Sequence, residues 1–367
     1  MCLASIYALL PGLAAPRRIH LVVNPFGGGG AGLAARDAVL PIFEAAGVEV
    51  TELQTKYAGH AGDFARTVPL QDGFVGIGGD GTAHEIANGM LRRPEAERVP
   101  VGIIPAGSGN TWAFDLGLDD AVSAARIVAS GATTDVDVLA ISSTDQPEVV
   151  EEYAINIAGY GMPAAVLSQA NALRWLGSAQ YELAGLVLIA SGRTSFDAEI
   201  EIEGEDGACT KRRLEGFSFV QGQVNQHMGK RVPFAPYARM DDGLLDLVLV
   251  TKAGGLDIIY SNALARTGEH TALPFVEVVR CRSFTLRPTG SDREGSFALR
   301  PTGSDREDGI TSPQSLNLDG ELTGVAPFRA ACVPGALRVY ASRLRTDPNV
   351  GDVGDPLYAL VKFVLRL

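Results

Sequence analysis

Cysteine and clustered positive charge are the two features that this sequence most clearly lacks. Only four of its 367 residues are cysteines, and no two of them form a Cys-x-x-Cys pair. The spacing of a structural zinc site is therefore absent, and a disulfide framework is not expected in a chain of this size. The net charge is −12, and no run of lysine and arginine is longer than three residues, so we expect no surface that neutralises nucleic-acid phosphates.

Long apolar runs are missing as well. Apart from the first 15 residues, the longest, residues 183–191, is too short to cross a hydrocarbon core of about 30 Å. Residues 1–15 are apolar, but the positive residues Arg17 and Arg18 follow them instead of preceding them, which is not typical of a secretory signal. We therefore expect a cytoplasmic protein with reduced thiols that contacts a membrane surface transiently at most. The sequence does not indicate an oligomeric state.

What the sequence does contain is a regular alternation of strand and helix patterns in its first third. Buried-strand patterns cover residues 19–23, 48–53, 74–77 and 99–104, and helical patterns cover 33–46, 60–68 and 83–91. Pro41 lies inside the first helical pattern and predicts a kink or a helix start there. Strands that alternate with helices predict a parallel sheet covered on both faces, with its ligand at the carboxyl ends of the strands.

The pattern changes after Thr134. Strand-like stretches cover residues 152–157, 196–203, 213–220, 244–250, 275–286 and 337–341, and helical patterns cover only 164–188 and 256–266. This pattern of many strands and few helices predicts a second, mainly antiparallel domain. We accordingly expect an α/β domain at 17–134, a β-rich domain at 135–345 and a C-terminal tail at 346–367.

One segment is duplicated. Residues 283–294 recur almost unchanged as residues 296–307. A single tandem copy does not make a solenoid, which needs about three units or more. We interpret it as a local duplication that lengthens a polar loop, and we assign it no chemistry.

Three glycine-rich turns follow three successive strands of the first domain. They span residues 24–30, 78–82 and 105–110. Each lies between a strand and a helix, so its backbone amides can point at an anion beside the helix N-terminus. Glycine suits such turns because a Cβ would keep the backbone away from a phosphate. None of the three contains the Gly-Lys-Ser/Thr of a P-loop or the dinucleotide-binding fingerprint.

The second of these turns carries an acid, Asp80. A carboxylate within a phosphate-binding turn is electrostatically unfavourable unless a Mg²⁺ ion or a proton transfer involves it. The alternative is a helix N-cap, a position that aspartate occupies readily. Because three such turns occur together and one of them is acidic, the pattern favours a phosphate-binding site.

These motifs and their order resemble the family of diacylglycerol kinases and sphingosine kinases. The resemblance runs from about Arg18 to Tyr340. In the first domain it rests on Gly-Gly-Asp-Gly-Thr at 78–82 with His84-Glu85 and Asn88-Gly89, on Pro-Ala-Gly-Ser-Gly-Asn at 105–110, on Asn24-Pro25, and on Thr55 with residues 59–61. In the second domain it rests on Ala235-Pro236, residues 241–246 and Asp-Gly-Glu-Leu at 319–322.

The resemblance implies an α/β fold with two domains. The N-terminal domain would be a Rossmann-like nucleotide-binding domain, and the C-terminal domain a mainly antiparallel β-sandwich that takes the lipid. The active site would lie in the cleft between them. The implied activity is that of an ATP- and Mg²⁺-dependent lipid kinase acting on a lipid substrate at a membrane surface.

The resemblance also implies roles for individual residues. Asp80 is expected to act as the general base or within a Mg²⁺–water network, and Glu321, from the other domain, is the second candidate for the base. Nucleotide contacts are expected from Asn24, Pro25, Gly27, Gly28, Thr55, Gly79, Asp80, Gly81, Thr82, Glu85, Gly107, Ser108, Asn110, Arg174 and Glu321. Metal contacts are expected from Asp80, Asp241 and Asp242.

Two departures from the family pattern leave the lipid open. The sequences of the motifs are most similar to the branch of sphingosine and ceramide kinases. That branch usually has a basic residue in the first turn, where this chain has Gly29. Sphingosine kinases also carry an acid ahead of the helix that contains Arg174, where it holds the substrate amine, and residues 166–169 contain none. A sphingoid base, a ceramide and a diacylglycerol are all candidates.

Two other functions stay open at this point. One is an NAD kinase-like enzyme that phosphorylates a soluble nucleotide, because the Gly-Gly-Asp-Gly turn also occurs there. The other is a non-catalytic, nucleotide-gated lipid-binding protein. The histidines do not help to decide, because His60, His84, His227 and His270 lack the spacing of metal ligands, and we expect them to serve in packing or capping.

Overall fold

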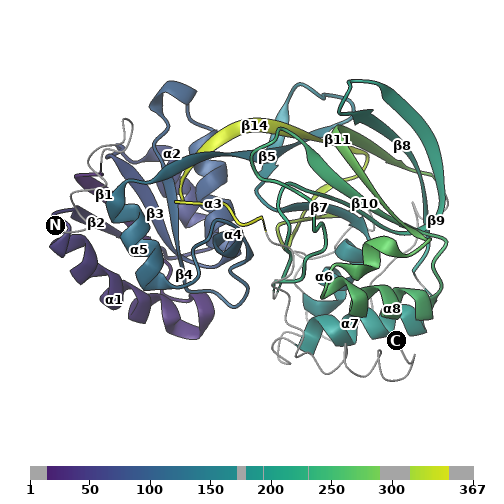
Figure 1. The fold of residues 1–367 in the computed structure, drawn as a ribbon, viewed down its shortest axis with the longest axis horizontal. Helices are drawn as coiled ribbons and strands as arrows, with labels where there is room; N and C mark the ends of the chain where they lie inside the picture. Colours follow the sequence, from purple (N-terminus) through teal and green to yellow (C-terminus); the bar gives the residue numbers. More distant parts are fainter. Residues whose placement is uncertain (1–14, 172–178, 193, 230, 290–314, 347–367) are drawn as a thin grey trace, which may run out of the picture.

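The protein has two halves, each with its own hydrophobic core (Figure 1). The structure, a computed structural model, describes residues 15–171, 179–192, 194–229, 231–289 and 315–346. The strands in these residues form one continuous sheet of 14, in which a parallel part belongs to the first half and an antiparallel part to the second. The site lies where the two parts approach each other.

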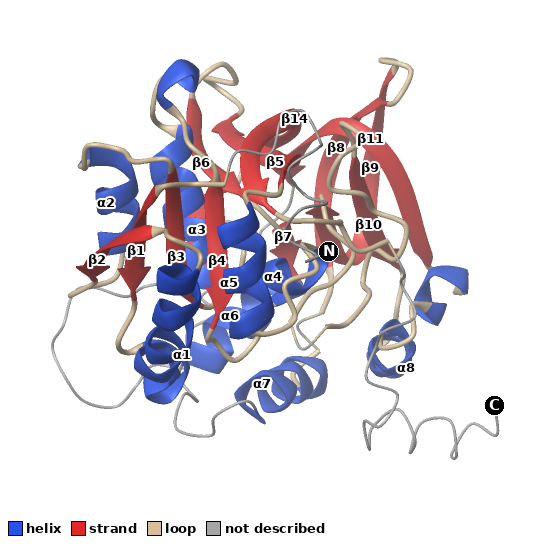
Figure 2. Cartoon of the chain, turned by 60° about the vertical axis from the view of Figure 1, so that its left-hand side comes forward, coloured by secondary structure: helices blue, strands red, loops and turns tan. Residues whose placement is uncertain are grey.

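The first half is a parallel sheet between two layers of helices. Strands β1 and β3 are almost entirely buried, so both faces of the sheet need cover. Helices α1 and α5 pack together on one face, and α2 and α3 pack together on the other (Figures 1 and 2). The strands are β1 (Arg18–Val23), β2 (Glu49–Gln54), β3 (Gly73–Gly78) and β4 (Val101–Pro105), in the order β4-β3-β1-β2, and the helices are α1 (Ala31–Ala45), α2 (His60–Thr67), α3 (Asp80–Leu91), α4 (Thr111–Asp115) and α5 (Ala121–Ser130).

The strands and long helices predicted for this half are confirmed, with small shifts at their ends. Pro41 neither starts nor ends a helix, since α1 runs through it. Val39 and Phe43 are fully buried on either side of Pro41, and this packing holds the helix where the proline removes a hydrogen bond. Helices α4 and α5 were not predicted. Helix α5 begins with a capping box formed by Asp120 and Ser123, a local signal that hydrophobic periodicity does not contain.

Two long antiparallel strands connect the halves. Strand β5 (Thr133–Ser143) pairs along its length with β14 (Phe328–Tyr340), and Val339 of β14 also pairs in parallel with β4. Figure 1 shows this two-stranded ribbon running from the first half into the second. The chain therefore returns to the first half near the end of its described part.

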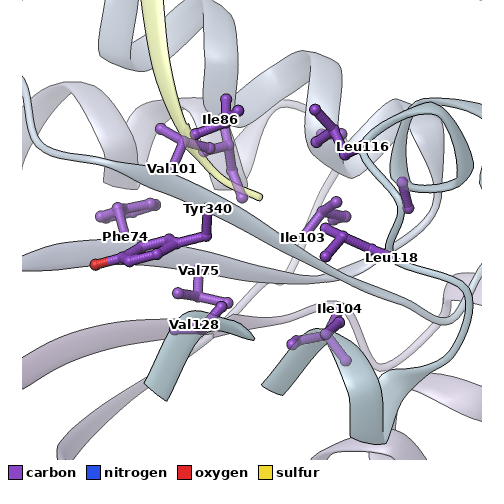
Figure 3. Close-up of a cluster of buried hydrophobic side chains, with 14 of the residues drawn as sticks. Phe74, Val75, Ile86, Val101, Ile103, Ile104, Leu116, Leu118, Val128 and Tyr340 are labelled. Carbon is purple, nitrogen blue, oxygen red and sulfur yellow. The ribbon is translucent and has the colours of Figure 1, made fainter. Parts of the chain in front are cut away.

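The end of β14 is buried in the first core. The ring of Tyr340 packs over two glycines, Gly73 and Gly102. A Cβ added to Gly73 would lie 2.2 Å from the hydroxyl oxygen of Tyr340, and one added to Gly102 would lie 3.1 Å from Cδ2 of its ring. Figure 3 shows the ring beside Phe74 and Val75. Residues 337–341 were expected in the β-rich half but pack in the first one. The domain limits 17–134, 135–345 and 346–367 stay a prediction.

The second half is a mainly antiparallel β-sandwich. Its long strands β9 and β11 each pair with β10 along one part and with β8 along another, so both pass from one layer to the other. The layers enclose a core with Phe217, Phe284 and Phe328 fully buried. The strands are β6 (Val150–Ala154), β7 (Ile157–Gly161), β8 (Phe196–Gly204), β9 (Cys209–Gln223), β10 (Leu245–Thr251), β11 (Val276–Pro288), β12 (Ser315–Leu318) and β13 (Glu321–Val325). The predicted fold class, α/β with a β-sandwich, is confirmed.

Three helices lie together at one end of the sandwich (Figures 1 and 2): α6 (Met162–Asn171), α7 (Ala179–Ala190) and α8 (Gly255–Ala265). The single helical stretch expected at 164–188 is thus two helices, which pack against each other. The strand expected at 152–157 is divided into β6 and β7. No helix in the described residues combines the length and the apolar character that crossing a membrane requires. Most of the duplicated segment, from residue 290, and the tail from residue 347 lie outside the described residues.

Candidate active site

The three glycine-rich turns pack against one another at the carboxyl ends of β1, β3 and β4. Gly28, within the 3₁₀ turn Gly27–Gly30, has a φ of 57°, and a Cβ there would lie 2.1 Å from the carbonyl oxygen of Ala106. A Cβ on Gly107 would lie 2.4 Å from Cα of Gly79. The first turn therefore touches the third, and the third touches the second. Only glycine permits approaches this close.

The outer side of the first turn is open. Nothing lies within 4 Å of the Cβ positions of Gly29 and Gly30. Helices α1 and α3 begin after Gly30 and Gly79 without a side-chain cap. The uncapped amides of a helix N-terminus attract anions. The three turns, residues 24–30, 78–82 and 105–110, therefore form a cradle that fits the phosphates of a nucleotide.

Two predicted phosphate contacts also hold the turns in shape. Asn24 donates through Nδ2 to the hydroxyl of Thr82 at 3.3 Å, which ties the first turn to α3. Asn110 has a φ of 55° and exchanges two hydrogen bonds of 2.8 Å with the backbone of Gly107. The other predicted contacts lie on the same turns, with Pro25 and Gly27 on the first, Gly79 and Gly81 on the second and an exposed Ser108 on the third.

Glu85 and Thr55 lie beside this cradle. The carboxylate of Glu85 accepts the amide of Gly59 at 2.7 Å and that of Ala61 at 3.1 Å, so it caps the N-terminus of α2. Thr55 is buried directly after β2. The structure thus gives Glu85 a capping task, and its predicted contact with the nucleotide stays a prediction, as does that of Arg174, which lies outside the described residues.

Asp80 is the first residue of α3, and it lies against the start of α4. Its Oδ1 accepts the amide of Trp112 at 3.0 Å, so it caps the neighbouring helix and not its own. Burial raises the pKa of Asp80, the amides of Trp112 and Thr111 lower it, and the charges of Asp319 and Asp115 raise it further, with a net shift upwards. A carboxylate with a raised pKa is a stronger proton acceptor than an ordinary one.

Glu321 reaches the same place from the other half. It is the first residue of β13, and its side chain is exposed. A Cβ on Gly81 would lie 3.9 Å from Glu321 Oε1. Asp80 and Glu321, the two predicted catalytic residues, therefore come from different halves and both lie at the first turn of α3.

A buried ionic network joins the halves one turn further along α3. Nδ1 of His84 lies 2.7 Å from Oδ2 of Asp319, and its Nε2 lies 2.9 Å from Oε1 of Glu152. Burial acts to raise the pKa of Glu152, but the hydrogen bonds from His84 and Thr323 outweigh it and lower the pKa. His84 was expected to serve in packing or capping, and the structure gives its buried ring a more specific task, because it connects the two halves.

A second buried network lies at the end of α4. Nδ1 of His227 lies 2.5 Å from Oδ1 of Asp115. Asn225 donates through Nδ2 to Asp115 and to Asn156, both at 2.8 Å. All four side chains are buried. These residues tie α4, directly after the third glycine turn, to the second half, and none of them was predicted as functional.

Asp241 and Asp242 lie elsewhere. Asp242 forms an ion pair with Arg280, and Asp241 lies 3.2 Å from Arg239. Both line an open cavity of about 740 Å³ together with Asp135, Asp137, Glu203 and Glu205. Among the described residues, no three His, Cys, Asp or Glu side chains gather as a metal-ligand group. The structure therefore does not bring the predicted metal contacts Asp80, Asp241 and Asp242 into one set.

Sequence reasoning missed the residues that connect the halves. The only signal available was the presence of polar side chains among apolar neighbours, such as His84 in α3 and Asp115 in α4, both of which the structure buries. That signal marks a residue as buried and polar, but it does not name the partner. The partners of His84 are 235 and 68 positions away in the sequence.

The comparison with known families divides the chain in the same way as the two halves. Residues 18–141 match the family model described as Diacylglycerol kinase catalytic domain. Residues 156–341 match the model described as YegS C-terminal NAD kinase beta sandwich-like domain. The two matches lie in the order in which the halves follow one another.

Individual relatives match between about half and 85% of the chain. Sphingosine kinase 1 of Arabidopsis thaliana is 28% identical over 334 residues, which span 78% of this chain and 68% of that protein. Diacylglycerol kinase of Bacillus subtilis (strain 168) is 27% identical over 323 residues, or 85% and 92% of the two chains. Ceramide kinase of Homo sapiens is 30% identical over 190 residues, or 47% and 35%. A crystal structure of a diacylglycerol kinase from Bacillus anthracis str. Sterne has a TM-score of 0.60 at 19% identity, covers 89% of this chain and 98% of that chain, and shows the shared fold.

Proposed function

Because the chain belongs to the lipid kinase family of diacylglycerol kinases and sphingosine kinases, we propose that it transfers the γ-phosphoryl group of ATP to a hydroxyl group of a membrane lipid. The chain is a phosphotransferase that acts on a lipid alcohol. One observation carries the proposed reaction above all others. Asp80 of the first half and Glu321 of the second both lie at the first turn of α3, beside three glycine turns of which two lead into helices without a side-chain cap.

ATP and Mg²⁺ are the proposed nucleotide and ion. The open side of Gly29 and Gly30 is where the phosphates would approach the backbone. Mg²⁺ usually binds one or two protein carboxylates together with phosphate oxygens, so Asp80 beside the cradle suits it without a group of three carboxylates. When bound, the ion neutralises charge on the transferred phosphoryl group. The metal role of Asp241 and Asp242 stays a proposal.

The proposed step needs positioning and one proton acceptor. The oxygen of the lipid hydroxyl forms a bond to the γ-phosphorus while the bond from that phosphorus to the β-phosphate oxygen breaks, and ADP leaves. The hydroxyl proton passes to the carboxylate of Asp80, whose raised pKa suits this task. Glu321 is the second candidate for the base. If Asp80 is the base, the exposed carboxylate of Glu321 near Gly81 would orient the lipid hydroxyl.

The lipid is proposed to bind along α6 and α7. Helix α6 packs against β12 and β13, the hairpin that carries Glu321, so a lipid held there has its head group near the site. Helix α6, Met162–Asn171, contains no carboxylate to hold a charged amine. A ceramide or a diacylglycerol is therefore the first candidate substrate, and a sphingoid base the second.

The test is a transfer assay with a panel of acceptors. The purified protein is incubated with γ-labelled ATP, Mg²⁺ and mixed micelles of ceramide, diacylglycerol or sphingosine, with NAD as a soluble acceptor. We expect label in ceramide or diacylglycerol. More label in sphingosine than in ceramide or diacylglycerol would contradict the preference for a lipid without a charged amine. Label in NAD alone would favour the NAD kinase-like alternative. ATP binding without transfer to any acceptor would favour a non-catalytic lipid-binding protein.

Asp80→Asn is the matched variant in this assay. Asparagine keeps the acceptor for the amide of Trp112 but takes no proton at neutral pH, so turnover should fall by at least about a hundredfold. Removal of a desolvated charge should leave the melting temperature unchanged or raise it. Asp37→Asn, at an exposed position on α1, is the control and should change neither quantity. Near-normal turnover of Asp80→Asn would show that another residue accepts the proton.

A further inference from the structure

Helix α3 contacts the second half along one polar face. His84, Asn88 and Arg92 follow one another at intervals of four residues, so they share a face of the helix. Asn88 exchanges two hydrogen bonds with the backbone of Tyr153, at 2.7 and 2.9 Å, and Arg92 donates to the carbonyl oxygen of Glu151 at 2.6 Å. His84 differs from both, because it contacts charged side chains and lies one turn from Asp80.

Asp319 is the more deeply buried partner of His84. Its side chain is fully buried, and its two oxygens accept the consecutive amides of residues 155–157 at 2.8 to 2.9 Å. Asp319 has a φ of 53° and Gly320 one of 96°, so the chain turns sharply before it reaches Glu321. The place of Glu321 therefore depends on where Asp319 is held.

Glu152 connects His84 to the same hairpin at a second point. One oxygen of Glu152 lies 2.9 Å from Nε2 of His84, and the other accepts the hydroxyl of Thr323 at 2.8 Å. Thr323 lies on β13, two residues beyond Glu321. Glu321 thus lies between two residues that are both connected to one imidazole ring.

The charge of the ring fits this arrangement. Burial by itself would lower the pKa of His84, but the hydrogen bonds to Asp319 and Glu152 outweigh it and raise the pKa to about 10. At neutral pH the ring is a cation, and both of its nitrogens are donors. A neutral ring would donate through one nitrogen only and would leave one buried carboxylate without its partner.

We propose that His84 is a positioning residue for the kinase reaction: it holds the β12–β13 hairpin through Asp319 and Glu152 and so places Glu321 at the first turn of α3, the turn that carries Asp80. The effect on turnover rests on the proposed lipid kinase function. The effect on the hairpin does not, and it can be measured without a substrate.

Two amide substitutions separate the two contacts of the ring. In His84→Asn the amide nitrogen lies near the place of Nδ1 and keeps a donor for Asp319, whereas in His84→Gln it lies near the place of Nε2 and keeps a donor for Glu152. Asp319 is fixed by three amides and leads directly to Glu321. Because a misplacement of about 1 Å can lower a rate about a hundredfold, we expect His84→Gln to lower kcat by about tenfold or more and His84→Asn by about threefold at most. The Kd for ATP should stay unchanged in both, since neither touches the glycine turns.

Hydrogen exchange measures how firmly Asp319, at the turn of the hairpin, is held against residues 155–157. The amides of residues 155–157 donate to Asp319, so we expect them to exchange faster in His84→Gln and at nearly the wild-type rate in His84→Asn. Asn88→Ala is the matched control, because it removes two hydrogen bonds of the same helix face with the backbone of Tyr153, and a longer contact of 3.4 Å with His84 Nε2, but no contact with the hairpin. It should lower the melting temperature while kcat stays within about twofold of wild type.

Three results would overturn the proposal: equal kcat for the two His84 variants, an equal loss of kcat in Asn88→Ala at the same loss of stability, or unchanged exchange of residues 155–157 in His84→Gln. If His84→Gln does not fold, Thr323→Val cuts the contact with Glu152 without altering the ring. It should lower kcat by about threefold and speed amide exchange in β13, and no change in either would also count against the proposal. If the wild-type protein phosphorylates no lipid, the proposed function fails, and hydrogen exchange alone decides whether His84 holds the hairpin.

Discussion

Among single residues, the neighbouring glycines of the first turn have different tasks. Gly28 faces the protein, where a Cβ would lie 2.1 Å from the carbonyl oxygen of Ala106. Gly29 faces open space, with nothing within 4 Å of its Cβ position. A side chain at Gly28 would therefore disturb the contact between two turns, whereas a side chain at Gly29 would meet whatever binds there.

Gly29→Asp and Gly29→Asn test this division. Asparagine and aspartate both tolerate the left-handed backbone of Gly29, at a φ of 68°, so their conformational costs are similar and their charges differ. A carboxylate beside the phosphates should weaken ATP binding at least about tenfold relative to asparagine. Calorimetry with ATP and Mg²⁺ measures this, and thermal melting controls for folding. Equal affinities of the two variants would mean that the phosphates do not lie against this turn.

Among the helices and strands, α7 is unusual because three of its large apolar residues are exposed. Three of them lie at positions i, i+3 and i+4 and share one face, and Leu256 at the start of α8 is 82% exposed. Figures 1 and 2 show α7 and α8 at the same end of the sandwich. An apolar surface of this kind suits insertion into a lipid interface, which is the membrane contact proposed for the lipid substrate. The three exposed residues of α7 are Leu183, Leu186 and Val187.

The double substitution Leu183→Gln with Leu186→Gln tests this contact. Each leucine that inserts into lipid contributes about 1.5–3 kcal/mol, so binding to phosphatidylcholine vesicles should fall at least about tenfold. Sedimentation with vesicles measures the bound fraction. Leu33→Gln is the control, because Leu33 is also exposed but lies on α1 in the other half. Equal binding of the double variant and the control would place the membrane contact elsewhere.

For the whole molecule, the β5–β14 ribbon makes the two halves depend on each other. Leu337, Val339 and Tyr340 are buried in the first core although they come from the far end of the described chain. Without them, Gly73 and Gly102 would face a gap the size of the Tyr340 ring. The first half is therefore incomplete until the second half has brought β14 back to it.

A fragment of residues 15–143 should accordingly fail to unfold cooperatively in urea, because it lacks β14. In the full chain, Tyr340→Ala should lower the free energy of unfolding by about 3–5 kcal/mol, the usual cost of removing a buried aromatic ring. Circular dichroism followed through urea unfolding measures both. The same fragment with residues 328–346 joined by a flexible linker is the control and should recover a cooperative transition. Cooperative unfolding of the shorter fragment would show that the first half does not need β14.

Much of the first half could be predicted because its signals are local. Alternating strand and helix periods, and glycine turns after strands, depend on residues a few positions apart, and they located β1 to β4 and the cradle. Asp80 was singled out for the same reason, since an acid in a phosphate-binding turn is unusual in any fold. Helix α4 was not predicted because it is short and because the residue that caps its start, Asp80, is distant in sequence and gives no local signal.

What the sequence determined by itself is thus the alternation of elements, the glycine turns and the acids Asp80 and Glu321 within their motifs. Only the tertiary structure decided that Glu321 lies beside Gly81, the neighbour of Asp80, that Asp241 and Asp242 line a separate cavity, and that His84 is bonded to Asp319 and Glu152. The physical reason is that a buried polar side chain must find a hydrogen-bond partner, and the chain supplies that partner from wherever folding brings it.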